Sequence, residues 1–180
     1  MSFTLVSGYI PFQFRDCGRY DRTVVFDKLQ ILPHPIPIQS RSPLNASLSF
    51  TLKQTLNNDV KVKIDFRRLV SIFGFQTKIP APCIGTFGSC EHRFCDLYKD
   101  AEKTFCPILQ RVGKECTCPI ETGVYASNGI PIQLPTVNLP SIIAAIGSGN
   151  YELTAKFVDR SGKEIGCIEV KLPVDMSRKY

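Results

Sequence analysis

The chain has 180 residues, a length that predicts one globular domain over residues 1–180. We expect the domain to be soluble, because 43% of its residues are hydrophobic and 21% are charged, and no run approaches the roughly 18 apolar residues of a membrane-spanning helix. Its 22 Lys and Arg residues against 16 Asp and Glu give a formal charge of +6, which favours solubility and mild attraction to anionic lipid headgroups. The basic residues stand singly or in pairs such as Arg67-Arg68, without a basic helix or known fingerprint, which argues against a nucleic-acid partner.

The N-terminal part is expected to be extended, with residues 1–10 loosely held. Residues 1–8 lack the cationic start and apolar run of a signal peptide, so we expect any signal to have been removed. The run Val24–Leu32 is typical of a strand. Prolines 33, 35 and 37 then exclude a central strand and a helix, which leaves an edge strand or a polyproline-like crossing.

Two alternating segments follow. Asn45-Ala46-Ser47 is an N-glycosylation sequon just before the strand pattern of residues 48–53, which makes Asn45 a candidate glycan site in a secreted chain. In residues 60–67 apolar and polar residues alternate strictly, which predicts an antiparallel strand with one apolar face and one face toward solvent.

The alternation breaks in residues 69–76. Phe73 and Phe75 flank Gly74 there. They are either buried core or an apolar loop offered to a ligand or a membrane, and for each residue taken alone we favour core.

Residues 83–118 hold six of the eight cysteines. Within them, residues 91–102 have helix formers and apolar residues spaced for the one short helix of the chain. Proline-interrupted edge strands are expected at residues 123–125 and 130–135, and residues 141–146 form an apolar hexad between loop signals. Residues 151–157 and 168–172 alternate around a Ser-Gly turn and predict a β-hairpin.

The cysteines indicate disulfides rather than a metal site. Eight is an even number, and clustering with Gly, Pro and aromatic residues favours an oxidising compartment, either secretory or lysosomal. The spacing of Cys116-x-Cys118 and the upstream cysteines is not that of a structural zinc site, so we expect no metal.

Catalytic signatures are weak. The two histidines, His34 and His92, lie in no nucleophile pattern, and His92 is expected to be an exposed helix residue. The carboxylates fall mostly on polar strand faces, where solvation explains them, although an acidic pair of the glycosidase kind stays open. The apolar strand faces must either pack into a solid core or enclose an apolar guest, and periodicity alone does not decide between the two.

The cysteine order and its flanking residues resemble the ganglioside GM2 activator-like branch of the secreted lipid-recognition (ML, or MD-2-related) domain family, from about Phe12 to Leu172. The segments that carry the resemblance are Lys78-Ile79-Pro80, residues 88–97 from Gly88 to Leu97, Cys116-Thr117-Cys118-Pro119, Leu139-Pro140-Ser141, Gly149-Asn150-Tyr151 and residues 161–168 from Ser161 to Ile168.

The resemblance implies an all-β fold, a β-cup of two antiparallel sheets around a large apolar cavity whose mouth is surrounded by apolar loops, with four disulfides. It implies the pairs Cys17–Cys167, Cys83–Cys90, Cys95–Cys118 and Cys106–Cys116. The lipid-binding and mouth residues are then expected to be Ile64, Phe66, Phe73, Phe75, Ile142, Ile143, Ile146, Tyr151 and Leu153.

The implied function is non-enzymatic. Such a protein extracts a glycolipid or phospholipid from a membrane into its cavity and presents the headgroup to a soluble hydrolase, in sphingolipid metabolism, in the lysosome or outside the cell. Bound lipid is the ligand, no cofactor is expected, and the partners are lipid, a transient membrane surface, and a lysosomal glycosidase or a receptor. Alternatives are a secreted lipid-recognition module in immune signalling or host interaction, and a lipid hydrolase.

Two departures from the family pattern bear on the partners. The mouth loops of the family carry tryptophan, whereas this chain has none, and the matching positions fall near Gln76 and at Ile142. The chain is also basic, whereas the resembled activator is acidic, which makes an anionic phospholipid or glycolipid the more natural ligand.

Overall fold

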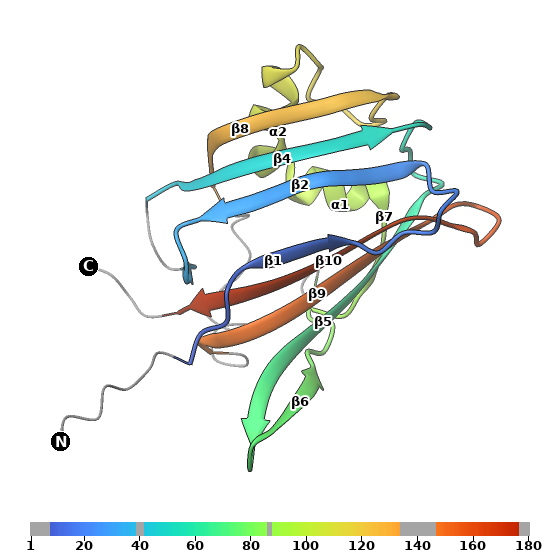
Figure 1. Cartoon of the computed structure of the whole chain (residues 1–180). Coiled ribbons are helices and arrows are strands. Elements are labelled where there is room, and N and C mark those ends of the chain that lie inside the picture. Colours follow the sequence, from blue (N-terminus) through green and yellow to red (C-terminus); the bar gives the residue numbers. More distant parts are fainter. Residues whose placement is uncertain (1–7, 39–41, 86–87, 134–146, 177–180) are drawn as a thin grey trace.

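The computed structural model describes residues 8–38, 42–85, 88–133 and 147–176, and within them the chain forms ten strands and two helices (Figure 1). In chain order these elements are β1 (Gln13–Asp16), β2 (Val24–Leu32), β3 (Ile36–Pro37), β4 (Leu44–Leu52), β5 (Lys61–Ile72), β6 (Phe75–Pro80), β7 (Glu91–Arg93), α1 (Phe94–Asp100), α2 (Glu102–Arg111), β8 (Gly123–Ile132), β9 (Gly149–Val158) and β10 (Glu164–Asp175).

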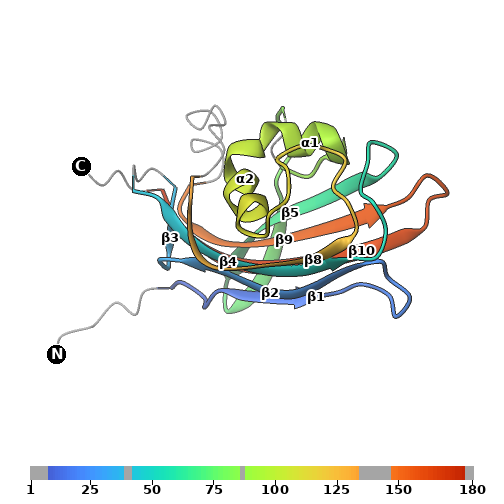
Figure 2. The ribbon, with the colours of Figure 1, turned by 90° about the horizontal axis from the view of Figure 1, so that it is seen from above.

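The strands form two sheets. The larger sheet has the order β1-β10-β9-β5-β6, with β3 paired to β10 and β7 paired to β5, and the smaller sheet has the order β2-β4-β8. Pairing is antiparallel except between β3 and β10. The two sheets adjoin where β1 lies beside β2 (Figure 1), and the helices cover the opposite side of the space between them (Figure 2). The predicted all-β fold of two antiparallel sheets, a β-cup, is confirmed.

The central strands are those that the alternation predicted. Val62 of β5 pairs with Phe157 of β9, and Phe66 pairs with Leu153, so the apolar residues of both strands share one face. The predicted C-terminal hairpin is β9 and β10, which pair from Glu164 opposite Val158 to Val174 opposite Gly149.

The prediction of one short helix was wrong. Residues 91–93 form β7, which pairs with Lys61–Lys63 of β5, and two helices, α1 and α2, follow. Consequently His92 is not an exposed helix residue but lies half-buried in a strand, opposite Val62. The second helix contains Pro107, a residue that ordinarily argues against a helix interior.

The helices close one side of the cup. Tyr98 of α1 and Leu109 of α2 are buried in a cluster with Leu52 and Tyr125 of the smaller sheet. Thr104 Oγ1 also donates a hydrogen bond to the carbonyl of Gln133 at 2.6 Å, which ties α2 to the end of β8. No helix in the described ranges is long and apolar enough to span a membrane.

Four disulfides form, and their pairing is the one that the resemblance implied. Every cysteine is paired. The bonds are Cys17–Cys167, Cys83–Cys90, Cys95–Cys118 and Cys106–Cys116.

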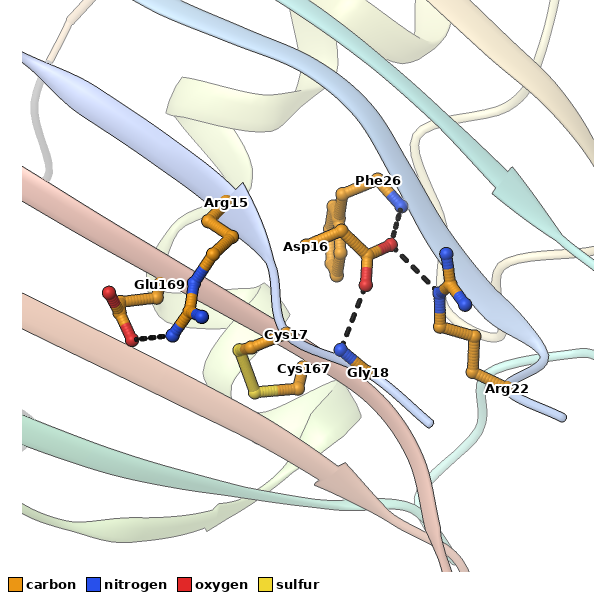
Figure 3. Close-up of a disulfide and its surroundings, with 8 residues drawn as sticks. All are labelled: Arg15, Asp16, Cys17, Gly18, Arg22, Phe26, Cys167 and Glu169. Carbon is orange, nitrogen blue, oxygen red and sulfur yellow. Dashed lines mark hydrogen bonds and ion pairs between the residues drawn. A yellow bond between two sulfur atoms is a disulfide. The ribbon is translucent and has the colours of Figure 1, made fainter. Parts of the chain in front are cut away.

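Where β1 meets β2, Asp16 joins the two sheets beside the Cys17–Cys167 disulfide (Figure 3). Its carboxylate accepts hydrogen bonds from the backbone N–H of Phe26 at 2.9 Å, the N–H of Gly18 at 2.9 Å and Nε of Arg22 at 3.0 Å. Burial raises the pKa of the Asp16 carboxyl. The three hydrogen bonds and the charge of Arg22 together lower it by more, so the pKa lies below the ordinary value.

Asn150 holds the described part of the N-terminal segment. Its Oδ1 accepts from the Ile10 N–H at 3.0 Å, and its Nδ2 donates to the Gly8 carbonyl at 2.7 Å. The first part of the segment expected to be loose, residues 1–7, lies outside the described residues, as does the apolar hexad of residues 141–146.

Candidate lipid-binding site

The inner face of the larger sheet is a continuous apolar surface. Because side chains alternate along a strand, Val62, Ile64 and Phe66 of β5 point to the same side as their pairing partners on β9. The inner-facing residues of β9 and β10 are Tyr151, Leu153, Ala155, Phe157, Ile168, Val170, Leu172 and Val174.

The smaller sheet supplies the opposite wall. Its apolar side chains pack with those of the larger sheet: the tilted rings of Phe26 and Phe157 have centroids 5.8 Å apart, and Leu172 packs against the cluster around Leu44 and Ile130. The other members of this wall are Leu29, Ile31, Ala46, Phe50 and Ile132.

Phe66 and Tyr151 form the innermost aromatic pair of the β5–β9 region. Their rings stack with centroids 5.1 Å apart, and Tyr151 is fully buried. The Tyr151 hydroxyl donates to the Gly147 carbonyl at 2.6 Å. Burial raises the pKa of this phenol, while the positive charge of Arg68 lowers it by less, so the hydroxyl stays protonated as a donor at neutral pH.

Several inner-face side chains are only partly covered. Ile64, Leu153 and Leu172 pack against the Phe66–Tyr151 cluster, yet each keeps some accessible surface. An apolar guest between the sheets would remove that surface from water, at about 25 cal/mol per Å².

Two hollows in the described part of the chain are polar, and neither lies on the apolar inner face of the larger sheet. One, of about 520 Å³, lies over the charged outer face around Asp65 and Lys156. The other, of about 340 Å³, lies between α2 and the segment around Lys114 and Glu121. Neither is the large apolar cavity that the resemblance implies; the candidate site is the set of apolar side chains on the inner faces of the two sheets.

The β5–β6 hairpin carries the apolar surface out to solvent. It extends away from the other strands in Figure 1. At its turn Phe73 is 96% exposed and Phe75 is 77% exposed, so the interpretation of these residues as core was wrong. Ile72 and Ile79 of the same hairpin are also exposed.

The hairpin turn consists of Phe73 and Gly74, and Phe75 begins β6 directly after it. Phe73 has φ 50° and Gly74 has φ 81°, the two positive φ angles that a two-residue type I′ turn requires. Such a turn normally holds Asn or Gly, and a bulky residue there costs about 1–2 kcal/mol. Phe73 is thus held at the tip of the hairpin despite an unfavourable backbone.

An ion pair on the outer face braces this hairpin. Lys78 of β6 donates to both carboxylate oxygens of Glu152 on β9, at 2.9 and 3.0 Å. Glu152 is only 8% exposed, and Lys171 of β10 lies 3.9 Å from it. The clamp spans β6, β9 and β10, so it resists bending of the hairpin away from the sheet.

Arg68 lies between the buried cluster and the exposed hairpin. It follows Phe66 in the β5 alternation and pairs with Tyr151, so its side chain is on the inner face. Its Nη2 donates to the Ser148 carbonyl at 2.9 Å. The guanidinium lies against Gly149, where a Cβ atom would be 3.3 Å from Nη2.

The expected site residues fall into three groups. Ile64, Phe66, Tyr151 and Leu153 lie together on the inner face. Phe73 and Phe75 lie apart from them, on the hairpin turn. The remaining three, Ile142, Ile143 and Ile146, are outside the described residues.

Sequence reasoning missed two parts of the site. The same alternation that selected Ile64 and Phe66 would have placed Arg68 on the inner face, but its neighbour Arg67 made the two appear as a surface pair. The wall formed by the smaller sheet had no local signal, because contact between sheets depends on the tertiary fold.

Asn45, the candidate glycan site, lies on β4 and is exposed. Its Nδ2 donates to the Gly129 carbonyl at 3.2 Å, and Ser47 Oγ accepts from the Gly129 N–H at 2.9 Å. The neighbouring Leu44 and Ala46 are buried between the sheets, so Asn45 faces outward.

A protein-family model described as the ML domain matches residues 11–174. This chain belongs to the ML domain family. It is therefore a lipid-binding domain, as the inner apolar faces suggest, and ML domains are not enzymes. The matched residues begin just before β1 and end in β10, so they include the strands of both sheets and the two helices.

Among solved structures, this ML domain is similar to a Niemann-Pick type C2 protein from the Japanese carpenter ant. The two are 15% identical with a TM-score of 0.43, and the alignment covers 91% of this chain and 99% of that chain. A comparison with curated proteins found no match.

Proposed function

We propose that this ML domain is a non-enzymatic lipid carrier. It extracts a glycolipid or phospholipid from a membrane, holds the acyl chains between its two sheets, and leaves the headgroup at the end of the cup near the β5–β6 hairpin. As in the ganglioside GM2 activator-like branch that its sequence resembles, the headgroup is then presented to a soluble hydrolase.

One observation carries this proposal. On the inner face of β5, apolar side chains lead from the buried pair Phe66 and Tyr151 to the exposed turn at Phe73, with Arg68 as the one polar residue between them. A monomeric soluble protein rarely leaves such an apolar projection in water without a use for it. A lipid surface covers the projection, and the interior takes the chains that leave that surface.

The energetics require such a path. Exposing an acyl chain of about 15 methylene groups to water costs about 12 kcal/mol, since each contributes about 0.8 kcal/mol. A carrier must therefore replace bilayer contacts with protein contacts as the lipid leaves. The half-covered side chains of Ile64, Leu153 and Leu172 supply those contacts.

The hairpin is the proposed membrane contact. Phe73 and Phe75 are exposed aromatic residues at and beside the turn of a projecting hairpin. The two phenylalanines keep this turn apolar, without the interfacial preference of the tryptophans that the family pattern carries.

The carrier works in an oxidising compartment, either secreted or in the lysosomal lumen. All eight cysteines are in disulfides, a state that persists outside the reducing cytosol. A glycan on the outward-facing Asn45 fits the same setting, because β4 exposes this side chain away from the interior.

The direct test is lipid extraction by the delipidated protein. Incubation with phosphatidylcholine vesicles that contain labelled phosphatidylglycerol and a ganglioside, followed by re-isolation and mass spectrometry, should recover lipid bound near one molecule per protein without cleavage products. Protein that returns without lipid would refute the carrier function, and product formation would establish a hydrolase instead.

A double variant tests the hairpin separately. Phe73→Ser with Phe75→Ser removes two exposed rings, each worth about 1.5–3 kcal/mol when fully buried, so vesicle binding should weaken by at least tenfold. Tyr20→Ser is the matched control, because Tyr20 is 92% exposed in the β1–β2 connection, remote from the hairpin. Equal loss in both variants would show that the hairpin has no special role.

A further inference from the structure

We propose that β6 is a docking edge for a second copy of this chain, and that the two copies pair their β6 strands antiparallel about a two-fold axis at Thr77. The pairing joins the two larger sheets into one continuous sheet. It goes beyond the carrier function and does not depend on it, because it uses the backbone of the hairpin and no lipid.

The free edge of the larger sheet is β6. Within the described ranges this strand pairs on one side only, with β5, and all 6 of its residues are exposed. The hairpin extends away from the other strands (Figure 1), so a second chain can approach its open side. An exposed edge strand is a ready template for pairing with another chain.

The outward backbone groups of β6 belong to Gln76 and Lys78. In a hairpin with a two-residue turn, the residue after the turn, here Phe75, forms a hydrogen-bonded pair with the opposite strand, and the pairing alternates from there. The Ala81 N–H, an even number of residues further on, donates to the Phe66 carbonyl at 2.8 Å, as this alternation requires. Gln76 and Lys78 therefore each direct an N–H and a C=O away from β5.

The register about Thr77 pairs these outward groups completely. Gln76 of each copy then lies opposite Lys78 of the other, and the two pairs exchange four backbone hydrogen bonds. The neighbouring registers do not achieve this. An axis at Gln76 would place Lys78 opposite Gly74, which lies in the turn. An axis at Lys78 would set two like charges directly opposite each other and would pair Gln76 with Pro80, which has no N–H.

The side chains of β6 are complementary in this register. Phe75, Thr77 and Ile79 lie on the inner face with their partners on β5. Phe75 of one copy lies opposite Ile79 of the other, so two aromatic–aliphatic pairs cover residues that are 77% and 46% exposed in the single chain. On the outer face Gln76 lies opposite Lys78, so no like charges meet.

Two features that normally protect an edge strand do not protect β6. Lysine on an edge repels a second strand, but Lys78 is held on the outer face, where both carboxylate oxygens of Glu152 accept from its Nζ at 2.9 and 3.0 Å. Proline blocks pairing where an N–H is needed, but Pro80 lies beyond the four hydrogen bonds. The edge is therefore open to a second strand.

A second strand also satisfies this edge better than a membrane does. A bilayer can cover the rings of Phe73 and Phe75, but its hydrocarbon offers no partner to the N–H and C=O groups of Gln76 and Lys78. A second copy offers donors and acceptors in matched register. Pairing covers Phe75 and not Phe73, so pairing and membrane contact compete for the Phe75 ring.

The experiment measures self-association by sedimentation equilibrium. Wild type, Gln76→Glu, Gln76→Lys, Gln30→Glu and Gln30→Lys are compared over a range of concentrations. Because Gln76 lies opposite Lys78 of the other copy, its replacement adds an attraction or a repulsion twice at the axis. Gln30 is exposed on β2, outside the larger sheet, and its variants change the net charge by the same amounts.

We expect wild type to form a reversible dimer between about 10 µM and 1 mM, the range of a weak and small interface. Gln76→Glu should tighten the dimer by about fivefold and Gln76→Lys should weaken it by about fivefold, as two cross-strand charge pairs predict. Gln30→Glu and Gln30→Lys should associate as wild type does.

A cysteine at the axis tests the register directly. Opposite residues of a non-hydrogen-bonded antiparallel pair have Cα atoms about 4.5 Å apart, within the range of a disulfide. With oxidised glutathione as the oxidant, Thr77→Cys should give a covalent dimer on non-reducing electrophoresis. Gln76→Cys places the thiol opposite Lys78 and should remain monomeric. Peptide mapping checks that the four native disulfides are intact in both variants.

Three results would overturn the inference. A wild type that stays monomeric up to about 1 mM would refute self-pairing, even if it bound vesicles. Equal shifts in the Gln76 and Gln30 variants would assign association to net charge. Equal crosslinking of Thr77→Cys and Gln76→Cys would refute the register. Lipid extraction is a separate measurement, so failure of the carrier function would leave the dimer result unchanged.

Discussion

Replacement of Asp16 by asparagine tests how the closed side of the cup is held. The carboxylate accepts three hydrogen bonds, one of them from the Phe26 N–H at the edge of the smaller sheet, so it joins β1 to β2. Asp16→Asn keeps one acceptor oxygen, replaces the other with a donor that faces the N–H groups, and removes the charge next to Arg22.

The size of the effect follows from these contacts. Hydrogen bonds to a charged group contribute about 1.5–3 kcal/mol each, and the variant retains part of the set, so we expect a loss of about 2–3 kcal/mol of stability at pH 7. For a chain of this size 1 kcal/mol shifts Tm by about 2–4 °C, which gives a fall of about 4–12 °C. Asp159→Asn is the control, because Asp159 accepts from Ser161 and Lys163 only within its own exposed turn.

The pH dependence has a defined sign. The pKa of Asp16 is lowered from 3.8 in the folded protein, so the carboxylate stabilises the fold above its unfolded pKa, and this contribution is lost as the pH falls through the folded pKa. Thermal unfolding followed by circular dichroism should show a constant Tm difference between wild type and Asp16→Asn from pH 7 down to about 5, and a shrinking one below pH 3.8. A difference at pH 7 no larger than that of Asp159→Asn, or one that persists undiminished at pH 2, would refute this account.

Two further predictions concern the hairpin brace and the sequon. Glu152→Gln weakens the clamp to Lys78, so it should speed hydrogen exchange of the β6 amides from Phe75 to Ile79 severalfold while β10 changes little. Glu169→Gln, which affects the exposed pair with Arg15, should leave the exchange of these amides unchanged. Expression through a secretory pathway should give a species whose extra mass is lost with an endoglycosidase and is absent in Asn45→Gln. An unshifted wild type would show that the sequon is not used.

The strands were predictable because their signal is local. In residues 60–67 and 151–157 one side of each strand faces water and the other faces apolar side chains, so alternation records the burial directly. The disulfide pairing, by contrast, came from the resemblance alone, since eight cysteines allow many connectivities.

The errors have a common physical origin. Taken alone, Phe73 and Phe75 were favoured as core because large apolar residues are usually buried, although the resemblance placed them at the mouth; in the structure they lie at and beside the turn of a hairpin that projects into solvent. The helix α2 was missed because Pro107 argues against a helix locally, whereas Cys106–Cys116 and the packing of Ile108 and Leu109 hold it in place. In each case a turn or a tertiary contact outweighed the preference of the residue.

The proposed carrier needs a place where a lipid enters, and the contacts between the two sheets differ from one side of the cup to the other. On the side of β1 and β2, the Asp16 carboxylate and the hydrogen bond from the Thr23 N–H to the Ile165 carbonyl join the two sheets. Beside them the Cys17–Cys167 disulfide ties the end of β1 to β10 within the larger sheet. On the opposite side the two disulfide-linked helices fill the gap. Beside the β5–β6 hairpin the described inner-face contacts are mainly apolar packing and the hydrogen bonds from Arg68 to Ser148 and from Tyr151 to Gly147, while the Lys78–Glu152 ion pair lies on the outer face of the larger sheet. Apolar packing can be exchanged for acyl chains at little net cost, whereas disulfides and buried hydrogen bonds cannot, so this end of the cup is where the sheets can admit a guest.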